Sequence, residues 1–157
     1  MTNCKITATK EFVWDMAHLL PGHNGLCKNL HGHTYKLQVT VSNTESVIIG
    51  GPSAGMVIDF KHLKEIVNSV IVDRYDHAVV LQRQSGDAFE SALIDLCILH
   101  KKKMVLTHYR TTAENMVRDF AWQIGQALED LGQGKLVLEK VRLYETPTSY
   151  AEWIRED

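Results

Sequence analysis

The chain has 157 residues, a formal net charge of −2 at pH 7 and 23% charged residues. This length suits one domain with a single core, and the charge gives no long-range attraction to nucleic acid or to an anionic membrane. No apolar run approaches the roughly 20 residues of a membrane span, and the first residues lack the apolar stretch of a signal peptide. Three cysteines, an odd number, suit a reducing compartment better than a disulfide framework. We therefore expect a single cytoplasmic domain over residues 1–157, with neither nucleic acid nor membrane as a partner.

The first two predicted elements are strands that carry histidines on their apolar side. Residues two apart in a strand point to the same face, and in residues 11–18 the large apolar side chains share that face with His18. Residues 31–42 alternate in the same way, so that His31 and His33 share the face of Tyr35 and of the aliphatic residues that follow. The Gly- and Asn-rich stretch 19–30 is predicted as a loop between antiparallel neighbours.

Folding that loop back brings His18 beside His31 and His33. A catalytic zinc ion uses three protein ligands, often histidines, and leaves its fourth position for water or substrate. A lone inward-facing histidine is more often an ordinary core residue, and His-x-His alone is a weak signal. The matching parity of all three histidines favours a Zn²⁺ site.

Helices are predicted in the middle of the chain. After a Gly-rich loop over residues 43–55, Asp59 is a suitable N-cap for a helix over residues 60–73. Residues 87–103 show a second amphipathic pattern and end in three lysines, which suit the negative end of a helix dipole. This pattern runs through Phe89, Leu93, Leu96 and His100.

A short strand over residues 104–106 and one more helix follow. Thr111 and Glu114 have the Thr-x-x-Glu spacing of a capping box, and an apolar stripe from Met116 onward stops at Gly132. Residues 137–145 return to period two, and a turn leads to a last strand over residues 150–154. The shared face of the first of these strands carries Val137, Val141, Leu143 and Glu145. Strands at both ends with helices between them predict an α+β fold, an antiparallel sheet with helices packed on one face.

Cys27 lies four positions before His31, in the loop that ends at the histidines. As a fourth ligand it would close a structural metal site, and as a free thiol beside the metal it would act as a base or nucleophile. As a small buried side chain it would have no chemical role. The spacing alone leaves these three interpretations open.

Two further carboxylates are candidates for chemistry. Asp76 precedes His77, and an adjacent acid and imidazole suit proton transfer, although such a pair on a loop is more often surface structure. Glu145 shares a face with apolar residues, where a carboxylate needs hydrogen-bond donors such as a planar pair of N–H groups on a ligand. The alternative is a residue at the end of a strand that turns to solvent.

The chain resembles the superfamily of 6-pyruvoyltetrahydropterin synthase and 6-carboxytetrahydropterin synthase. The blocks that carry the resemblance occur in the family's order and span nearly the whole chain: residues 12–18, 21–35, 55–60, 75–77, 112–115 and 145–146. The spacing of Cys27, which three residues separate from His31-Gly32-His33, resembles that in the bacterial 6-carboxytetrahydropterin synthases of queuosine and 7-deazaguanine biosynthesis.

This resemblance implies roles for the candidate residues. His18, His31 and His33 would bind zinc, Cys27 would be the general base, and Asp76 with His77 would assist proton transfer. Glu145 would grip the pyrimidine edge of a pterin, and Glu114 is a weaker candidate because the capping box already explains it.

The implied reaction converts 7,8-dihydroneopterin triphosphate to 6-carboxy-5,6,7,8-tetrahydropterin, with release of acetaldehyde and triphosphate and without a redox cofactor. One rival is a 6-pyruvoyltetrahydropterin synthase or a related aldolase-type enzyme. Another is a non-catalytic pterin- or metal-binding module in which Cys27 completes the zinc shell.

The implied architecture is the tunnelling fold, in which the sheets of three subunits join into a barrel and two trimers stack into a hexamer. Active sites then lie between subunits. The segment 82–103 is longer than in the shortest family members, and Arg110-Thr111 replaces the Asn-Pro of many relatives.

Overall fold

The computed structural model describes residues 4–132 and 134–156. Residues 1–3 lie outside the described part. The expectation that the chain lacks a signal peptide rests partly on these residues. The strands and helices are β1 (Thr7–His18), β2 (His31–Asn43), α1 (Phe60–Val67), α2 (Asp73–Tyr75), β3 (Val79–Gln82), α3 (Ala88–Leu99), β4 (Met104–Thr107), α4 (Ala113–Gly132), β5 (Leu136–Thr146) and β6 (Ser149–Ile154). A 3₁₀ turn, η1 (Leu26–Lys28), lies in the first loop, and a π-helical segment, η2 (Asn68–Val72), joins α1 to α2.

The six strands form one sheet in the order β4-β3-β1-β2-β5-β6. Pairs β1–β2, β2–β5 and β5–β6 are antiparallel, as expected, and they confirm the loop over residues 19–30. Strands β1–β3 and β3–β4 pair in parallel, so the expectation of a purely antiparallel sheet was wrong at this edge. A four-residue strand such as β3 is too short to show an alternating pattern, and its parallel neighbour β4 is reached through the crossover helix α3. The α+β class is confirmed.

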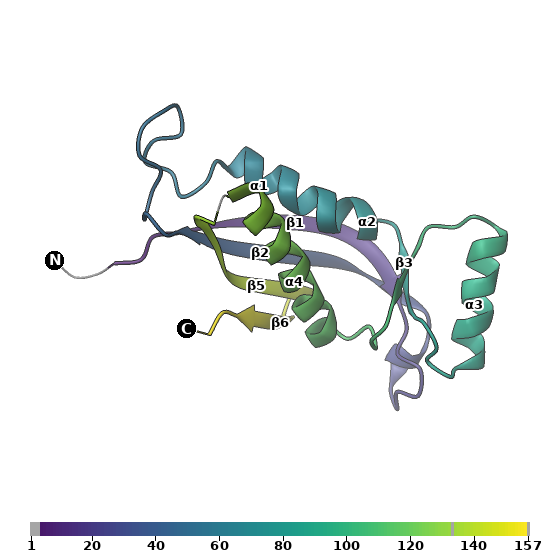
Figure 1. The fold of residues 1–157 in the computed structure, drawn as a ribbon. Coiled ribbons are helices and arrows are strands. Elements are labelled where there is room, and N and C mark those ends of the chain that lie inside the picture. Colours follow the sequence, from purple (N-terminus) through teal and green to yellow (C-terminus); the bar gives the residue numbers. More distant parts are fainter. Residues whose placement is uncertain (1–3, 133, 157) are drawn as a thin grey trace.

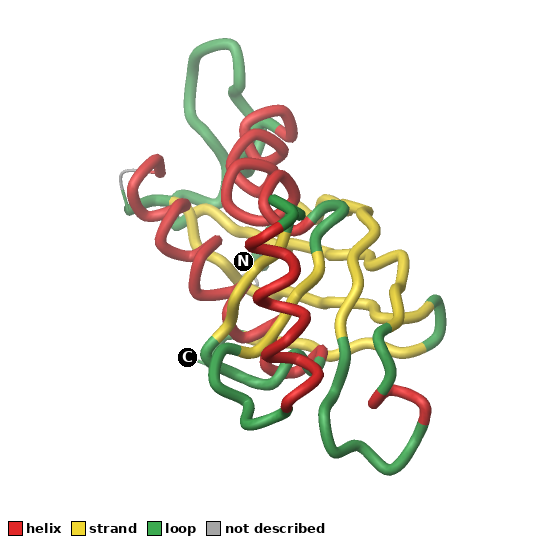
Figure 2. Tube along the Cα trace, turned by 90° about the vertical axis from the view of Figure 1, so that its right-hand side faces the viewer, coloured by secondary structure: helices red, strands yellow, loops and turns green. Residues whose placement is uncertain are grey.

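Helices α1, α2 and α4 cover one face of the sheet (Figures 1 and 2). The core forms where the period-two apolar face of the strands meets the helical stripes. Its large buried side chains include Tyr35, Leu37 and Leu143 from the sheet and Leu63, Phe120 and Ile124 from the helices. The histidines share this face, so the same alternation that builds the core also positions the site.

The second predicted helix differs most from its expectation. Helix α3 ends at Leu99, before the three lysines, and lies away from α1, α2 and α4 (Figure 1). It contacts the sheet at β3, where Glu90 Oε1 accepts from the Gln82 N–H at 2.7 Å. Phe89 and Leu96, which were expected to face a core, are exposed, whereas Glu90 and Cys97 are buried. The predicted amphipathic pattern was therefore wrong for this helix, because several of its large apolar side chains are exposed while a glutamate is buried.

Three other local predictions also changed. The Asp59 N-cap is confirmed, but the first helix continues beyond residue 73 through η2 to Tyr75. The N-cap of α4 is Thr112 rather than Thr111, since the Thr112 hydroxyl accepts from the Asn115 N–H at 3.4 Å. A bulge between β2 and β5 puts Leu138 in the core in place of Val137.

Candidate metal centre

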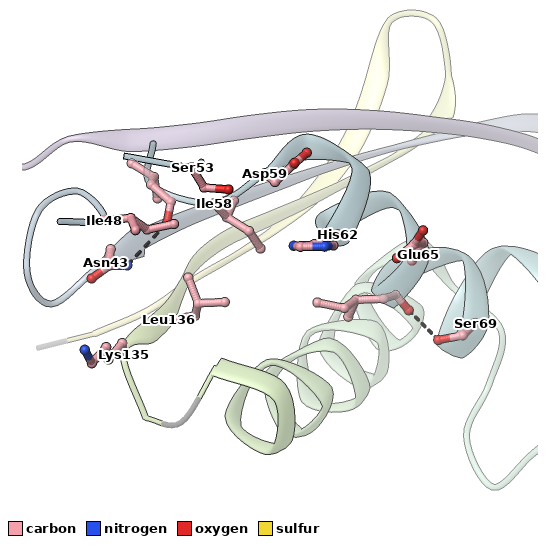
Figure 3. Close-up of a pocket in the computed structure, with 12 residues that line it drawn as sticks. Asn43, Ile48, Ser53, Ile58, Asp59, His62, Glu65, Ser69, Lys135 and Leu136 are labelled. Atoms are coloured by element: carbon pink, nitrogen blue, oxygen red, sulfur yellow. Dashed lines mark hydrogen bonds between the residues drawn. The ribbon is translucent and has the colours of Figure 1, made fainter. Parts of the chain in front are cut away.

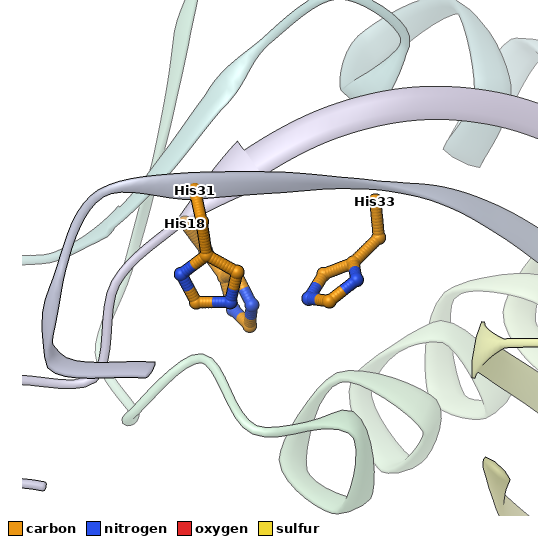
Figure 4. A group of neighbouring side chains, drawn as sticks. All are labelled: His18, His31 and His33. Carbon is orange, nitrogen blue, oxygen red and sulfur yellow. The ribbon is translucent and has the colours of Figure 1, made fainter. Parts of the chain in front are cut away.

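The pairing of β1 with β2 sets His18 directly opposite His31 and places His33 opposite Met16. Figure 4 shows the three rings on the same side of the two strands. Their centroids are 4.7 Å (His18–His31), 4.8 Å (His31–His33) and 5.4 Å (His18–His33) apart. One nitrogen from each ring lies within 4.8 Å of the others, so the three could hold a single metal ion. The predicted convergence is confirmed.

Backbone carbonyls fix the orientation of two of these rings. His18 Nδ1 donates to the carbonyl of Thr111 at 2.8 Å, and His31 Nδ1 donates to the carbonyl of Asn29 at 2.7 Å. A carbonyl only accepts, so these bonds place the ring proton on Nδ1 and leave the lone pair on Nε2. Histidines that ligate a metal usually donate their other ring N–H in this way, and the bond holds the ring in place.

The Nε2 atoms of His31 and His33 are buried, and within the described residues they have no hydrogen-bond partner. Buried polar atoms are normally paired, so two adjacent orphans on neighbouring histidines call for a ligand. Two unshared lone pairs beside a third imidazole suit a borderline ion such as Zn²⁺. The residues present therefore fit the predicted zinc ion.

Burial also favours the neutral, metal-binding form of two of the three imidazoles, those of His18 and His33. It lowers the pKa of His18 to about 4, against the opposing effect of the hydrogen bond to Thr111. Burial lowers the pKa of His33 as well, although the nearby charge of Glu145 acts in the opposite direction. Metal binding requires the neutral imidazole, so little proton release accompanies ligation by His18 at neutral pH.

Tyr35 is a site residue that the sequence analysis placed on the correct face but did not select. Its ring is fully buried and lies edge-on to His18 and His33, and its hydroxyl is 3.4 Å from His18 Nε2. Burial raises the pKa of Tyr35, and the charges of Glu145 and Cys27 raise it further. The hydroxyl therefore stays protonated in the middle of the site. A tyrosine two residues beyond His33 in the same strand is the signal that could have identified it.

Glu145 approaches the histidines from β5, the strand that pairs with β2. Its Oε1 lies 3.7 Å from His33 Nε2, and the residue is half-buried. The pairing of β5 with β6 shifts register between Tyr144 and Thr146, so Glu145 sits at an irregularity of the strand. Such irregularities redirect a side chain near functional sites. The structure thus brings this carboxylate to the three histidines.

Cys27 lies in η1, half-buried, and its carbonyl accepts from the Leu20 N–H at 2.8 Å. It is near enough to Tyr35 for its charge to raise the pKa of that hydroxyl. The set of mutually close ligand atoms nevertheless consists of the three histidines and does not include the Cys27 sulfur. In this geometry the thiol borders the site without joining the ligand set.

Asp76 and His77 form the expected pair, with His77 Nδ1 at 2.8 Å from Asp76 Oδ1, and neither belongs to the group of three close histidine nitrogens. His77 lines a cavity of about 650 Å³ together with Asp15 and Thr34, and His33 also borders this cavity. Asp15 and Thr34 pair across β1 and β2 on the strand parity opposite to that of the histidines. Within one chain, the acid–imidazole pair therefore faces the other side of the sheet.

Glu114 lies exposed in the first turn of α4. Since Thr112 is the N-cap of this helix, the capping box that was expected to occupy Glu114 is not formed.

The size of the cavities does not identify the position of the three histidines. A second cavity of about 650 Å³ lies far from the histidines, between α1 and the start of β5, where His62 points inward (Figure 3).

Fold and site together define an α+β protein that brings three histidine side chains together at the end of a sheet. A family model described as 6-pyruvoyl tetrahydropterin synthase matches residues 7–156. The chain belongs to this family.

Two named relatives support this assignment. A protein of Haemophilus influenzae named 6-carboxy-5,6,7,8-tetrahydropterin synthase is 41% identical over 92% of this chain and 96% of its own length. A protein of Pyrococcus horikoshii with the same name, qualified as putative, is 31% identical over 94% of this chain and 88% of its own length.

Solved structures show the same fold at low identity. The 6-pyruvoyl tetrahydropterin synthase of Caenorhabditis elegans superimposes with a TM-score of 0.63 at 21% identity, over 96% of each chain. An uncharacterized protein from Wolinella succinogenes superimposes with a TM-score of 0.80 at 19% identity, over 98% of this chain and 100% of its own. The tunnelling-fold expectation for the single chain is thereby confirmed.

Proposed function

We propose that this protein is a zinc-dependent lyase that converts 7,8-dihydroneopterin triphosphate to 6-carboxy-5,6,7,8-tetrahydropterin, with release of acetaldehyde and triphosphate, in queuosine and 7-deazaguanine biosynthesis. The observation that carries the proposal is the group of three histidine nitrogens within 4.8 Å of one another. The relative at 41% identity bears the name of this synthase, which supports the choice of product.

In this proposal His18, His31 and His33 hold the zinc ion. When bound, zinc supplies Lewis acidity that lowers the pKa of hydroxyl groups on the substrate side chain. Cys27 moves protons at the side-chain carbons, which suits a thiol that borders the ligand set. Asp76 and His77 assist that transfer from a neighbouring subunit, since in their own chain they face away from the histidines.

Tyr35 gives a first prediction, because its hydroxyl is the one described group within hydrogen-bond distance of His18 Nε2. This contact competes with a metal ion for the same lone pair. We expect Tyr35→Phe to bind Zn²⁺ about two- to tenfold more tightly in the absence of substrate, the worth of one hydrogen bond. Titration against a chelating indicator measures this. Tyr75→Phe, which removes another buried hydroxyl, is the control, and a weaker affinity in Tyr35→Phe would contradict the competition.

Glu145 is proposed to accept two N–H groups from the pyrimidine edge of the pterin. We expect Glu145→Gln to raise KM about tenfold to a hundredfold, because the amide replaces one acceptor with a donor and removes the charge. Steady-state kinetics on zinc-loaded protein measure the change.

Glu114→Gln is the matched control, since Glu114 is exposed and carries the same functional group. We expect its KM to stay within about twofold of wild type, as for surface substitutions. A large increase in Glu114→Gln together with none in Glu145→Gln would transfer the pterin-binding role to Glu114.

We also propose that the chain assembles as trimers that stack into hexamers. Strand β1 pairs with β3 only at Ala17 and His18, so most of its outer edge is unpaired within the described chain, and β6 is the other edge of the sheet. Two open edges on a twisted sheet suit closure with neighbouring subunits. Among the described residues, no helix combines the length and the apolar character that crossing a membrane requires.

Incubation of the purified protein with 7,8-dihydroneopterin triphosphate, followed by mass identification of the products, tests the proposed reaction. Acetaldehyde and a 6-carboxypterin are expected. A 6-pyruvoyl product or an aldolase-type cleavage would identify the rival activities of the same fold. Stoichiometric binding without turnover would identify a non-catalytic pterin-binding module.

A further inference from the structure

Helix α3 carries an apolar stripe that no described part of the chain covers. Phe89, Ala92, Leu96 and Leu99 follow one another at spacings of three, four and three residues, and therefore lie along one side of the helix. Their exposed fractions are 58% for Phe89, 51% for Leu96 and 72% for Leu99. Glu90 and Cys97 point to the side that is buried against the rest of the protein. A helix that is apolar on its outward side normally has a partner.

The spacing of the stripe indicates that the partner is another helix with the same pattern. Alternating steps of three and four residues are the seam of a helix pair, in which the side chains of one helix pack between those of the other. A second copy of α3 supplies such a seam.

The charges at the two ends of α3 determine the orientation of such a pair. Asp87 precedes the helix and Lys101 follows it, and neither belongs to an ion pair within the described chain. In an antiparallel pair that sets Phe89 against Leu99 of the partner subunit, Asp87 comes opposite the partner's Lys101 at both ends. A parallel pair would set Asp87 against Asp87 and Lys101 against Lys101, which is unfavourable.

We infer that α3 is an interface between two copies of this chain, which pack their stripes antiparallel about a two-fold axis. A stripe of about three helical turns is short for a stable contact on its own, since specific interfaces bury about 1,200 Å² or more. The pair therefore joins two rings, and this part of the inference rests on the proposed ring assembly. It does not depend on the proposed reaction.

The first test is the mass of the assembly in solution. Sedimentation of the double variant Leu96→Glu/Leu99→Glu is expected to give half the wild-type mass, with unchanged far-ultraviolet circular dichroism, because these side chains are exposed in the single chain. Ser91→Glu adds a charge to an exposed position of the same helix outside the stripe, and it should keep the wild-type mass. A monomeric wild type, or a double variant of wild-type mass, would overturn the inference.

Cysteine cross-linking tests the orientation independently of any loss of assembly. In a Cys4→Ser background, co-expressed Phe89→Cys and Leu99→Cys chains are expected to form a disulfide between the two kinds of chain on oxidation. Phe89→Cys alone should not cross-link. Cross-linking of Phe89→Cys to itself would show a parallel pair and overturn the antiparallel arrangement.

Discussion

A Cys27→Ala variant is expected to retain its zinc and to lose turnover about a hundredfold to ten-thousandfold, the usual contribution of a general base. The set of close ligand atoms comes from the three histidines and does not include the Cys27 sulfur, so removal of the thiol leaves the ligand set intact. Cys97 cannot take the place of the lost thiol beside Tyr35, because Cys97 lines the cavity on the other side of the sheet. Zinc content by elemental analysis and single-turnover kinetics on the same sample measure the two effects separately.

Two further substitutions distinguish the remaining interpretations of Cys27. Cys27→Ser keeps the size of the side chain but not its acidity, so a base should still be lost, whereas a side chain that only fills space should be replaced without loss. Cys4→Ala changes an exposed cysteine and should alter neither quantity. Loss of zinc from Cys27→Ala would mean that the sulfur is a fourth ligand, and the general-base role would then be wrong.

The convergence of the three histidines was predictable because it depends on a single periodicity. His18, His31 and His33 lie on the same strand parity as the core residues, and the loop between the strands is long enough to return the chain. Tyr35 follows from the same rule. The hydrogen bonds of His31 and His18 to the carbonyls of Asn29 and Thr111 could not be predicted in this way. Every residue has a carbonyl, and only the folded chain shows which carbonyl lies beside a ring nitrogen.

Register irregularities and pairings distant in sequence limited the other predictions. Val137 was assigned to the core face by alternation, but a bulge reverses the parity and buries Leu138 instead. The resemblance assigned Asp76 and His77 a role in proton transfer, and it did not indicate that His77 would lie beside Asp15 and Thr34, on the strand parity opposite to that of the histidines. Sequence indicates which residues can do chemistry, but the face that each one serves depends on the pairing of whole strands.

A His31→Ala variant is expected to lose most of its zinc. One of three ligands is removed. The loss of zinc affinity should therefore exceed the roughly 10- to 100-fold that follows from removing a residue that only hydrogen-bonds to a ligand. Within the described residues His31 Nε2 has no hydrogen-bond partner, so the truncation removes the ligand atom together with one hydrogen bond, from Nδ1 to the Asn29 carbonyl. The metal-free variant should fold, and its stability should no longer respond to zinc.

Thermal unfolding with and without Zn²⁺ tests this expectation without a need for substrate. A ligand at about a thousand times its Kd stabilises the native state by about 4 kcal/mol, so zinc should raise the Tm of the wild type by several degrees. The Tm of His31→Ala should change little at the same zinc concentration. His23→Ala is the matched control, because His23 is exposed and its ring accepts only from the nearby Gly25 N–H. An undiminished zinc content and Tm shift in His31→Ala would refute the three-histidine ligand set.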